Sequence, residues 1–121
     1  MSPKPTCFDV SIDDRVAHIQ MSRPDQFNTF TPDAWVELPA IVRDIDRNAS
    51  ARCIVLSSSG KHFTAGMDLA VFARPDGIVG TVNDPHLRAE KFRADLRPLQ
   101  DAFTCFEQAR MPVIACIQGG C

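Results

Sequence analysis

The chain has 121 residues, the length of one small domain, and 45% of them are hydrophobic and 23% charged, as in an ordinary globular protein. A net charge of −2 gives no reason to expect nucleic acid or an anionic membrane as a partner. The N-terminus lacks the apolar core of a signal peptide, and no apolar run approaches the roughly 20 residues of a membrane span, so we expect a cytoplasmic protein without membrane contact.

The five cysteines, Cys7, Cys53, Cys105, Cys116 and Cys121, include no Cys-x-x-Cys pair and are odd in number. Most lie in apolar runs, where a free cysteine packs as a small hydrophobic side chain. We therefore expect buried, reduced thiols, and a disulfide framework or a zinc site is the alternative. The three histidines are too few and too scattered for a metal cluster, so no metal site is expected.

Two stretches near the start of the chain, residues 8–12 and 16–21, alternate apolar and polar side chains and are separated by a pair of aspartates. This pattern predicts a β-hairpin. His18 falls on the face opposite the apolar residues of the second strand, so it is expected to face solvent. Residues 23–28 are rich in Pro, Asp and Asn and predict a loop.

A helix is predicted over residues 32–48. Thr31 is a good N-cap, Pro32 suits the first helical position, and Asp33 places a negative charge in the first turn. Pro39 lies inside the pattern, where proline costs about 3 kcal/mol and kinks a helix. The expected buried face consists of apolar residues at helical spacing: Trp35, Leu38, Ile41, Val42 and Ile45.

The central feature of the sequence is a strand that leads into a glycine turn and then a helix start. Residues 52–58 predict a strand, and the continuous apolar run of Ile54, Val55 and Leu56 within it is expected of a strand covered on both faces. In the turn at residues 57–69, Gly60 and Gly66 supply backbone freedom, and residues 68–72 begin a helix. Backbone N–H groups at such a turn lack intrahelical partners and are suited to stabilising a developing oxyanion.

The rest of the chain predicts a loop at 74–84, a long helix at 87–109 and a buried strand at 113–117, and residues 119–120 begin another turn. Pro98 is expected to kink the long helix. The predicted apolar side of that helix consists of Phe92, Leu96, Leu99, Phe103 and Phe106.

Four segments resemble, in order and spacing, the crotonase (enoyl-CoA hydratase/isomerase) superfamily. They are SRPDQFN at 22–28, RCIVL at 52–56, SSSGKHFTAGMDL at 57–69 and MPVIACIQGGC at 111–121. The resemblance extends over residues 7–121 and is nearest to dienoyl-CoA isomerases and bacterial enoyl-CoA hydratase/isomerases. It implies an α/β crotonase-like fold, a spiral of repeated β-β-α units.

The resemblance also implies how the domain is divided. Residues 1–121 are expected to form a single partial crotonase-like domain, the N-terminal portion. The family's second oxyanion donor and its usual acid/base carboxylates are expected beyond residue 121. Four carboxylates in the chain do not match the family's acid/base positions: Asp25, Asp68, Asp76 and Asp84.

By resemblance, the catalytic group of this chain is the backbone N–H of Met67, one donor of an oxyanion hole that stabilises a thioester enolate. The predicted substrate-binding residues flank coenzyme A and the thioester: Gln26, Thr64, Ala65, Gly66, Met67, Asp68 and Leu69. No cofactor is implied other than coenzyme A as part of the substrate. Relatives form trimers or hexamers, so a homo-oligomer is a family expectation.

Several positions keep two interpretations. Gln26 replaces the usual Lys or Arg of a loop that contacts the adenine end of coenzyme A; the alternative is an ordinary turn in which Arg23 pairs with a local carboxylate. Asp68 is expected to cap or brace the turn rather than act as a base, and His62 has no standard family role. The basic residues of the long helix form a solvated face or contact coenzyme A phosphates: Arg88, Lys91, Arg93 and Arg97.

Two main hypotheses of function follow. The first is the acyl-CoA-binding front half of an enoyl-CoA hydratase/isomerase, a lyase or isomerase of fatty acid metabolism. The second is a truncated, non-catalytic crotonase-like module that binds acyl-CoA weakly or associates with other chains. An unrelated small α/β domain is a third interpretation. Hydration, double-bond shift, hydrolysis and decarboxylation share this front half in the superfamily, so the reaction stays open.

Overall fold

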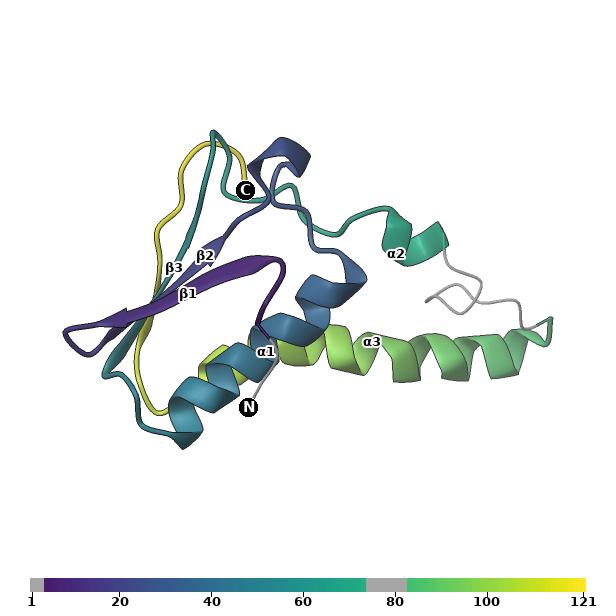
Figure 1. Ribbon diagram of the computed structural model, residues 1–121. Coiled ribbons are helices and arrows are strands. Elements are labelled where there is room, and N and C mark those ends of the chain that lie inside the picture. Colours follow the sequence, from purple (N-terminus) through teal and green to yellow (C-terminus); the bar gives the residue numbers. More distant parts are fainter. Residues whose placement is uncertain (1–3, 74–82) are drawn as a thin grey trace.

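The computed structural model describes residues 4–73 and 83–121 (Figure 1). Within these residues the strands form one mixed sheet in the order β1-β2-β3-β4. None of the helices described is long and apolar enough to cross a membrane. The elements in chain order are β1 (Phe8–Asp13), β2 (Val16–Met21), the 3₁₀ helix η1 (Pro24–Gln26), α1 (Pro32–Arg47), β3 (Cys53–Ser58), α2 (Ala70–Ala73), α3 (Pro85–Gln108) and β4 (Val113–Ala115).

The predicted hairpin is confirmed, because β1 pairs antiparallel with β2 along its whole length. Its two-residue turn is made by Asp14 and Arg15, with φ of 46° and 63°. Positive φ at both positions is what a type I′ turn requires, and its twist matches that of the strands. As expected, His18 is exposed between the buried Ala17 and Ile19.

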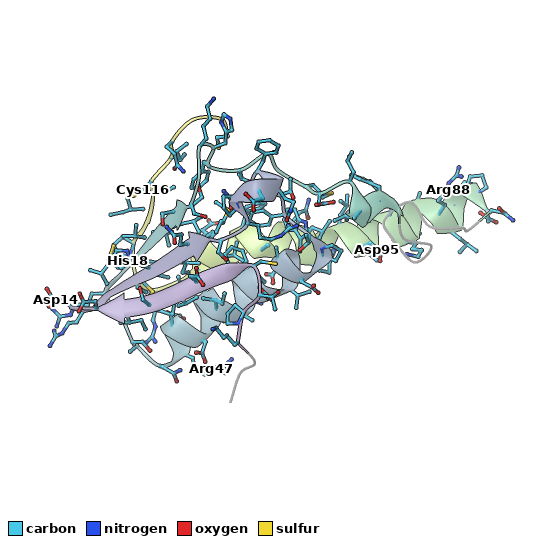
Figure 2. The ribbon with its side chains drawn as sticks, turned by 45° about the horizontal axis from the view of Figure 1, so that its top comes forward. Asp14, His18, Arg47, Arg88, Asp95 and Cys116 are labelled. Atoms are coloured by element: carbon cyan, nitrogen blue, oxygen red, sulfur yellow. The ribbon has the colours of Figure 1, made fainter. Side chains whose placement is uncertain are left out.

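β2, β3 and β4 run parallel, so each pair needs a crossover connection. α1 supplies the first crossover and α3 the second, and both pack on the same side of the sheet (Figure 1). The hairpin tip at Asp14 lies at the opposite end of the molecule from Arg88 on α3 (Figure 2). The core between sheet and α1 includes Ala17, Ile19, Ile54 and Leu56 from the strands and Leu38, Val42 and Ile45 from the helix.

α1 begins as predicted. The Thr31 side chain accepts a hydrogen bond from the Ala34 N–H at 3.3 Å, and Pro32 occupies the start of the helix. The helix continues without interruption through Pro39 to Arg47. Every residue of the predicted apolar face is buried, so the helical periodicity identified the core side of this element correctly.

The prediction that β3 is covered on both faces and that 113–117 is a buried strand is wrong. Ile54 and Leu56 are buried, but Val55 is only half-buried. β4 ends at Ala115, and Ile114 and Ile117 are 52% and 57% exposed. The physical reason is that both long helices lie on one side of the sheet (Figure 1), so within residues 4–73 and 83–121 the other face and the β4 edge stay open.

α3 also departs from its predicted pattern. It begins at Pro85, where Asp84 Oδ1 accepts hydrogen bonds from the next two free N–H groups at 2.8 and 3.3 Å. The helix buries Ala102 and Cys105, and Leu99 and Phe106 of the predicted apolar side pack against the core. Phe103 is 54% exposed, although its ring contacts those of Phe30 and Trp35. Phe92 is 43% exposed. The N-terminal half of α3 extends past α1 (Figure 1), so its apolar residues lie outside the core formed by the described residues.

Other predictions have mixed outcomes. α3 runs unbroken through Pro98. Residues 74–82 of the predicted loop, with Asp76, lie outside the described residues. All five cysteines are free thiols: two are buried, one is half-buried, and Cys116 and Cys121 are exposed, so burial was the wrong expectation for those two. Burial raises the pKa of the Cys105 thiol, as expected for a packed, unreactive cysteine.

Glu37 of α1 attaches the start of the chain to the helix. One carboxylate oxygen accepts hydrogen bonds from the Thr6 N–H at 2.9 Å and the Thr6 hydroxyl at 2.7 Å, and the other accepts the Cys7 N–H at 2.9 Å. Burial raises the pKa of Glu37, but the hydrogen bonds from Thr6 and Cys7 together outweigh it and lower the pKa below 4.5. The charged form is therefore the one that the folded chain stabilises.

We expect Glu37→Gln to lower the free energy of unfolding by about 1 kcal/mol at pH 7, because a charge-assisted contact is lost. The pKa of Glu37 is depressed on folding, so its contribution is present above the unfolded pKa and lost as pH falls through the folded pKa. The variant and the parent should therefore converge in acid. Urea unfolding at several pH values measures this, followed by the fluorescence of Trp35, the one tryptophan of the chain.

Glu107→Gln is the matched control, since Glu107 is exposed and its carboxylate makes no hydrogen bond within the part of the chain that the structure describes. It should change the free energy of unfolding by about 0.5 kcal/mol or less. A stability difference for Glu37→Gln that stays constant from neutral to acid pH would contradict this account of the carboxylate.

Candidate functional site

The candidate site forms where the loop at residues 23–28 meets the turn that follows β3. Asn28 joins the two and is only 2% exposed. Its Oδ1 accepts the Arg23 N–H at 3.0 Å, and its Nδ2 donates to the carbonyl oxygens of Ser59 and His62 at 2.8 and 3.1 Å. A buried amide with all these partners fixes the loop against the turn.

Asn28 is a site residue that the sequence analysis missed. Its φ is 52°, and that of its neighbour Phe27 is 54°. Asparagine tolerates this left-handed region better than most residues. An asparagine at the end of a loop rich in turn residues was therefore the available indication in the sequence. The sequence did not show which carbonyl groups its side chain would contact.

Thr64 and Ala65 are tied to the same loop. The Thr64 hydroxyl donates to the Asn28 carbonyl at 2.7 Å and accepts the Gly66 N–H at 3.1 Å. The Ala65 N–H donates to the Phe27 carbonyl at 2.9 Å. The polar groups of these two residues thus hold the turn in place.

Met67 lies opposite Phe30 in an isolated parallel bridge. The Phe30 N–H donates to the Gly66 carbonyl at 2.8 Å, and the Asp68 N–H donates to the Phe30 carbonyl at 2.9 Å. In a parallel bridge the flanking residues make the hydrogen bonds, so the N–H of Met67 itself points away from Phe30. It donates to no other group of the described chain, and it is the atom that the sequence analysis selected.

Gly66 gives the turn its shape with a φ of +88°, a value that side chains other than hydrogen rarely allow. Asp68 braces the other side of Met67. Its Oδ1 accepts the Ala70 N–H and its Oδ2 accepts the Thr29 hydroxyl, both at 2.9 Å. The Ala70 N–H and then the Thr29 hydroxyl lower the pKa of Asp68, so the carboxyl group is held as a carboxylate. The expected bracing role is confirmed.

The remaining predicted site residues lie at the edge of this arrangement. Gln26 is exposed, and its Oε1 accepts a hydrogen bond from the Arg23 guanidinium at 3.0 Å. Arg23 also donates to the Thr29 carbonyl at 2.8 Å. Among the described residues the hydrogen-bond partners of Arg23 are neutral oxygens, and it acts on the carboxylate of Asp68 only at longer range, where its charge also lowers the pKa of that group. Leu69 is 80% exposed at the start of α2.

An open hollow of about 400 Å³ adjoins the turn. Of the predicted residues it includes Thr64 and Ala65, whereas Met67 and the other predicted residues are outside its lining. The full lining is Phe27, His62, Thr64, Ala65, Gly120 and Cys121. It combines aromatic and apolar surface with a few polar groups, which is typical of a site for a small organic ligand.

The end of the described chain contributes to this hollow because it packs against the turn. The Phe63 N–H is shared between the carbonyl oxygens of Gln118 and Gly120 at 2.8 and 2.9 Å. The Gln118 side chain donates to the Ser58 hydroxyl at 2.9 Å. Segments almost sixty residues apart in sequence are thus brought to one site.

Comparison with known proteins gives consistent results. Residues 11–121 match the family model described as enoyl-CoA hydratase/isomerase. The peroxisomal Delta(3,5)-Delta(2,4)-dienoyl-CoA isomerase of Arabidopsis thaliana is 35% identical over 109 residues, which is 90% of this chain and 39% of that protein. The mitochondrial Delta(3,5)-Delta(2,4)-dienoyl-CoA isomerase of Homo sapiens is 35% identical over 88% of this chain and 32% of its own length. These relatives are peroxisomal and mitochondrial, so the cytoplasmic expectation is not confirmed.

Solved structures agree with the fold. A putative enoyl-CoA hydratase from Streptomyces coelicolor A3(2) superimposes with a TM-score of 0.75 and 28% identity, over 98% of this chain and 40% of that one. A putative enoyl-CoA hydratase/isomerase (crotonase) from Legionella pneumophila gives a TM-score of 0.77 and 25% identity, over 96% of this chain and 41% of the other. This sequence spans about two fifths or less of the length of these relatives.

Proposed function

This chain belongs to the enoyl-CoA hydratase/isomerase family, and from that premise we propose that it binds an acyl-CoA thioester and that the Met67 N–H stabilises negative charge on the thioester oxygen. The observation that carries the proposal is the geometry of the turn. The bridge to Phe30 directs the Met67 N–H away from Phe30, and Gly66 and Asp68 hold that orientation from both sides.

The chemical argument concerns charge that develops on the thioester oxygen when a proton leaves the α-carbon. A donor that is already oriented needs no rearrangement as that charge forms, and losing one such donor typically costs about 100- to 1000-fold in rate. Met67 is braced in this way, whereas the neighbouring N–H groups of Ala65, Gly66 and Asp68 already donate within the chain. Among residues 65–68 it is therefore the donor that remains for a ligand.

The proposed ligand is an unsaturated acyl-CoA. The hollow beside Thr64 and Ala65 is the proposed place of the coenzyme A portion. The exposed side-chain N–H₂ of Gln26 makes no hydrogen bond among the described residues and is proposed to bind a polar group at the outer edge of the ligand. No metal and no separate cofactor are part of the proposal. We do not assign a general base, because Asp68 is engaged in bracing and Asp25 is exposed on η1.

The test is calorimetric titration of the protein with crotonyl-CoA and with a butyl-CoA thioether, which lacks the thioester carbonyl oxygen. Because the proposed donor contacts that oxygen, the thioether should bind at least about fivefold more weakly. Met67→Ala keeps the backbone N–H and should preserve this preference. Equal affinity for the two ligands, or no binding of either, would overturn the proposal.

Asp68 offers a separate prediction. Because it braces the turn and does not remove protons, Asp68→Asn should lower acyl-CoA turnover by less than about tenfold, whereas loss of a general base typically costs 100-fold or more. Asn retains one acceptor for the Ala70 N–H and can keep the turn. Steady-state assays of the two proteins measure the difference, and a loss of about 1000-fold would mean that Asp68 takes part in proton transfer.

A second candidate function, association with other chains, is favoured by one observation. The open edge at β4 presents Ile114 and Ile117, both more than half exposed, and unpaired strand edges promote assembly. The proposed assembly is a homo-oligomer, trimer or hexamer. Sedimentation velocity over a range of concentrations tests it, and a monomer at every concentration would argue against it.

A further inference from the structure

His62 makes contacts that the proposed function has not used. Its Nδ1 accepts a hydrogen bond from the Gly120 N–H at 2.8 Å. Its ring lies against that of Phe27, with centroids 6.0 Å apart, and its carbonyl oxygen accepts from Asn28 at 3.1 Å. One residue thus joins the loop at 23–28, the turn that carries Met67 and the segment at 118–121.

The glycines opposite His62 fit this contact closely. A Cβ at Gly119 would lie 2.3 Å from the Lys61 carbonyl oxygen and 2.8 Å from His62 Nδ1, and the φ of Gly119 is +61°. A Cβ at Gly120 would lie 3.2 Å from the same nitrogen. The two segments can approach this closely only because both positions lack a side chain.

The hydrogen bond also determines the state of the ring. Because Nδ1 accepts the Gly120 N–H, it carries no hydrogen, and the neutral imidazole bears its hydrogen on Nε2. The lone pair of Nδ1 is occupied by a backbone contact, so this nitrogen is not available as a general base. The side chain is placed to hold structure rather than to transfer protons.

We propose that His62 is a positioning residue that, through the Gly120 N–H, holds the segment at 119–120 against the Met67 turn and so maintains one wall of the acyl-CoA hollow. This inference rests on the proposed function. His62 and Gly120 both line the hollow, so loss of the contact opens the wall at the place where the ligand is proposed to lie. His62 affects ligand binding by positioning the backbone of Gly120.

The experiment compares two variants by titration with crotonyl-CoA. His62→Leu keeps much of the volume but removes the acceptor, and we expect its affinity to fall about fivefold to tenfold. His62→Asn keeps an acceptor at the position of Nδ1 and should stay within about twofold of the parent. His18→Leu is the matched control, because His18 is exposed on β2 and is not in the lining; it should bind as the parent does.

Nuclear magnetic resonance supplies a readout that does not depend on ligand. The ¹⁵N shifts of the His62 ring should show a hydrogen on Nε2 and none on Nδ1, and the Gly120 amide proton should move upfield in His62→Leu but not in His62→Asn. Far-UV circular dichroism checks that each variant folds. If His62→Leu does not fold, the ring shifts of the parent and the acyl-CoA affinity of His62→Asn still test the positioning role of His62.

The outcomes separate the two proposals. If the parent binds crotonyl-CoA and His62→Leu binds equally well, the role of His62 is wrong and the proposed function stands. If the parent binds no acyl-CoA, the proposed function fails and the positioning role falls with it, whatever the ring shifts report. A hydrogen found on Nδ1 would by itself overturn the role of His62.

Discussion

Replacement of Gly66 by proline should lower the proposed acyl-CoA turnover by about 100-fold or more, the loss expected when an oxyanion donor is displaced. Gly66 has a φ of +88°, whereas proline requires a φ near −65°. Proline also removes the N–H that donates to the Thr64 hydroxyl at 3.1 Å. The backbone would therefore leave its present path immediately before Met67, and the proposed donor would lose its orientation. Steady-state assay with an unsaturated acyl-CoA measures the effect.

Gly66→Ala is a graded control for this prediction. No atom lies within 4 Å of the position that a Cβ at Gly66 would occupy, so alanine meets no steric obstacle and only the positive φ opposes it. That strain is about 1–2 kcal/mol, so alanine should reduce turnover by roughly tenfold and less than proline does. Circular dichroism confirms that both variants fold. Normal turnover by the proline variant would refute the assignment of this turn.

Replacement of Asn28 by alanine should lower the free energy of unfolding by about 3 kcal/mol, because it removes the side-chain partner of three part-buried backbone groups, of which only the His62 carbonyl keeps another, the Ser58 hydroxyl at 3.2 Å. The three groups are the Arg23 N–H and the carbonyl oxygens of Ser59 and His62. Alanine would also have to adopt the φ of 52°. Urea unfolding followed by Trp35 fluorescence measures the change. Because Asn28 fixes the loop against the turn, acyl-CoA affinity should fall with stability.

Two further variants sharpen the test. Asn48→Ala, at an exposed helix end with one side-chain hydrogen bond of 3.3 Å, should cost about 0.5 kcal/mol or less. Asn28→Asp keeps the acceptor for Arg23 but places a carboxylate oxygen near two carbonyl oxygens. It should be strongly destabilised at pH 7 and recover partly in acid, when the protonated carboxyl group regains a donor. An Asn28→Ala protein as stable as Asn48→Ala would contradict the role of this amide.

The sequence correctly predicted the elements in which apolar and polar side chains recur at a regular interval. The alternation at 8–12 and 16–21 predicted the hairpin, and the spacing from Trp35 to Ile45 predicted the buried face of α1, because a regular period fixes which side chains face the core. The same reasoning was right for α3 only where Leu99, Phe103 and Phe106 meet the core. Its apolar period is real, but the residues that can be buried are decided by where α1 lies, and periodicity carries no information about that.

For the candidate site, the sequence identified the turn but not its supports. The glycines and the segment from Thr64 to Leu69 selected Met67, and the capping role of Asp68 followed from its place at a helix start. Asn28 and His62 were missed or set aside, since their importance depends on partners 31 to 58 residues away. A side chain that bonds to distant backbone groups leaves no local pattern.

The sequence by itself determined the family, the hairpin, the first helix and the position of the glycine turn, because these depend on local spacing, backbone dihedral preferences and short motifs. Only the tertiary structure decided that the Met67 N–H is directed away from Phe30, that one face of β3 stays half open, and that His62 meets Gly120. These features arise where segments from separate parts of the chain come into contact. That contact determines which groups form hydrogen bonds and which side chains are buried. The sequence alone does not show how close two distant segments lie in space.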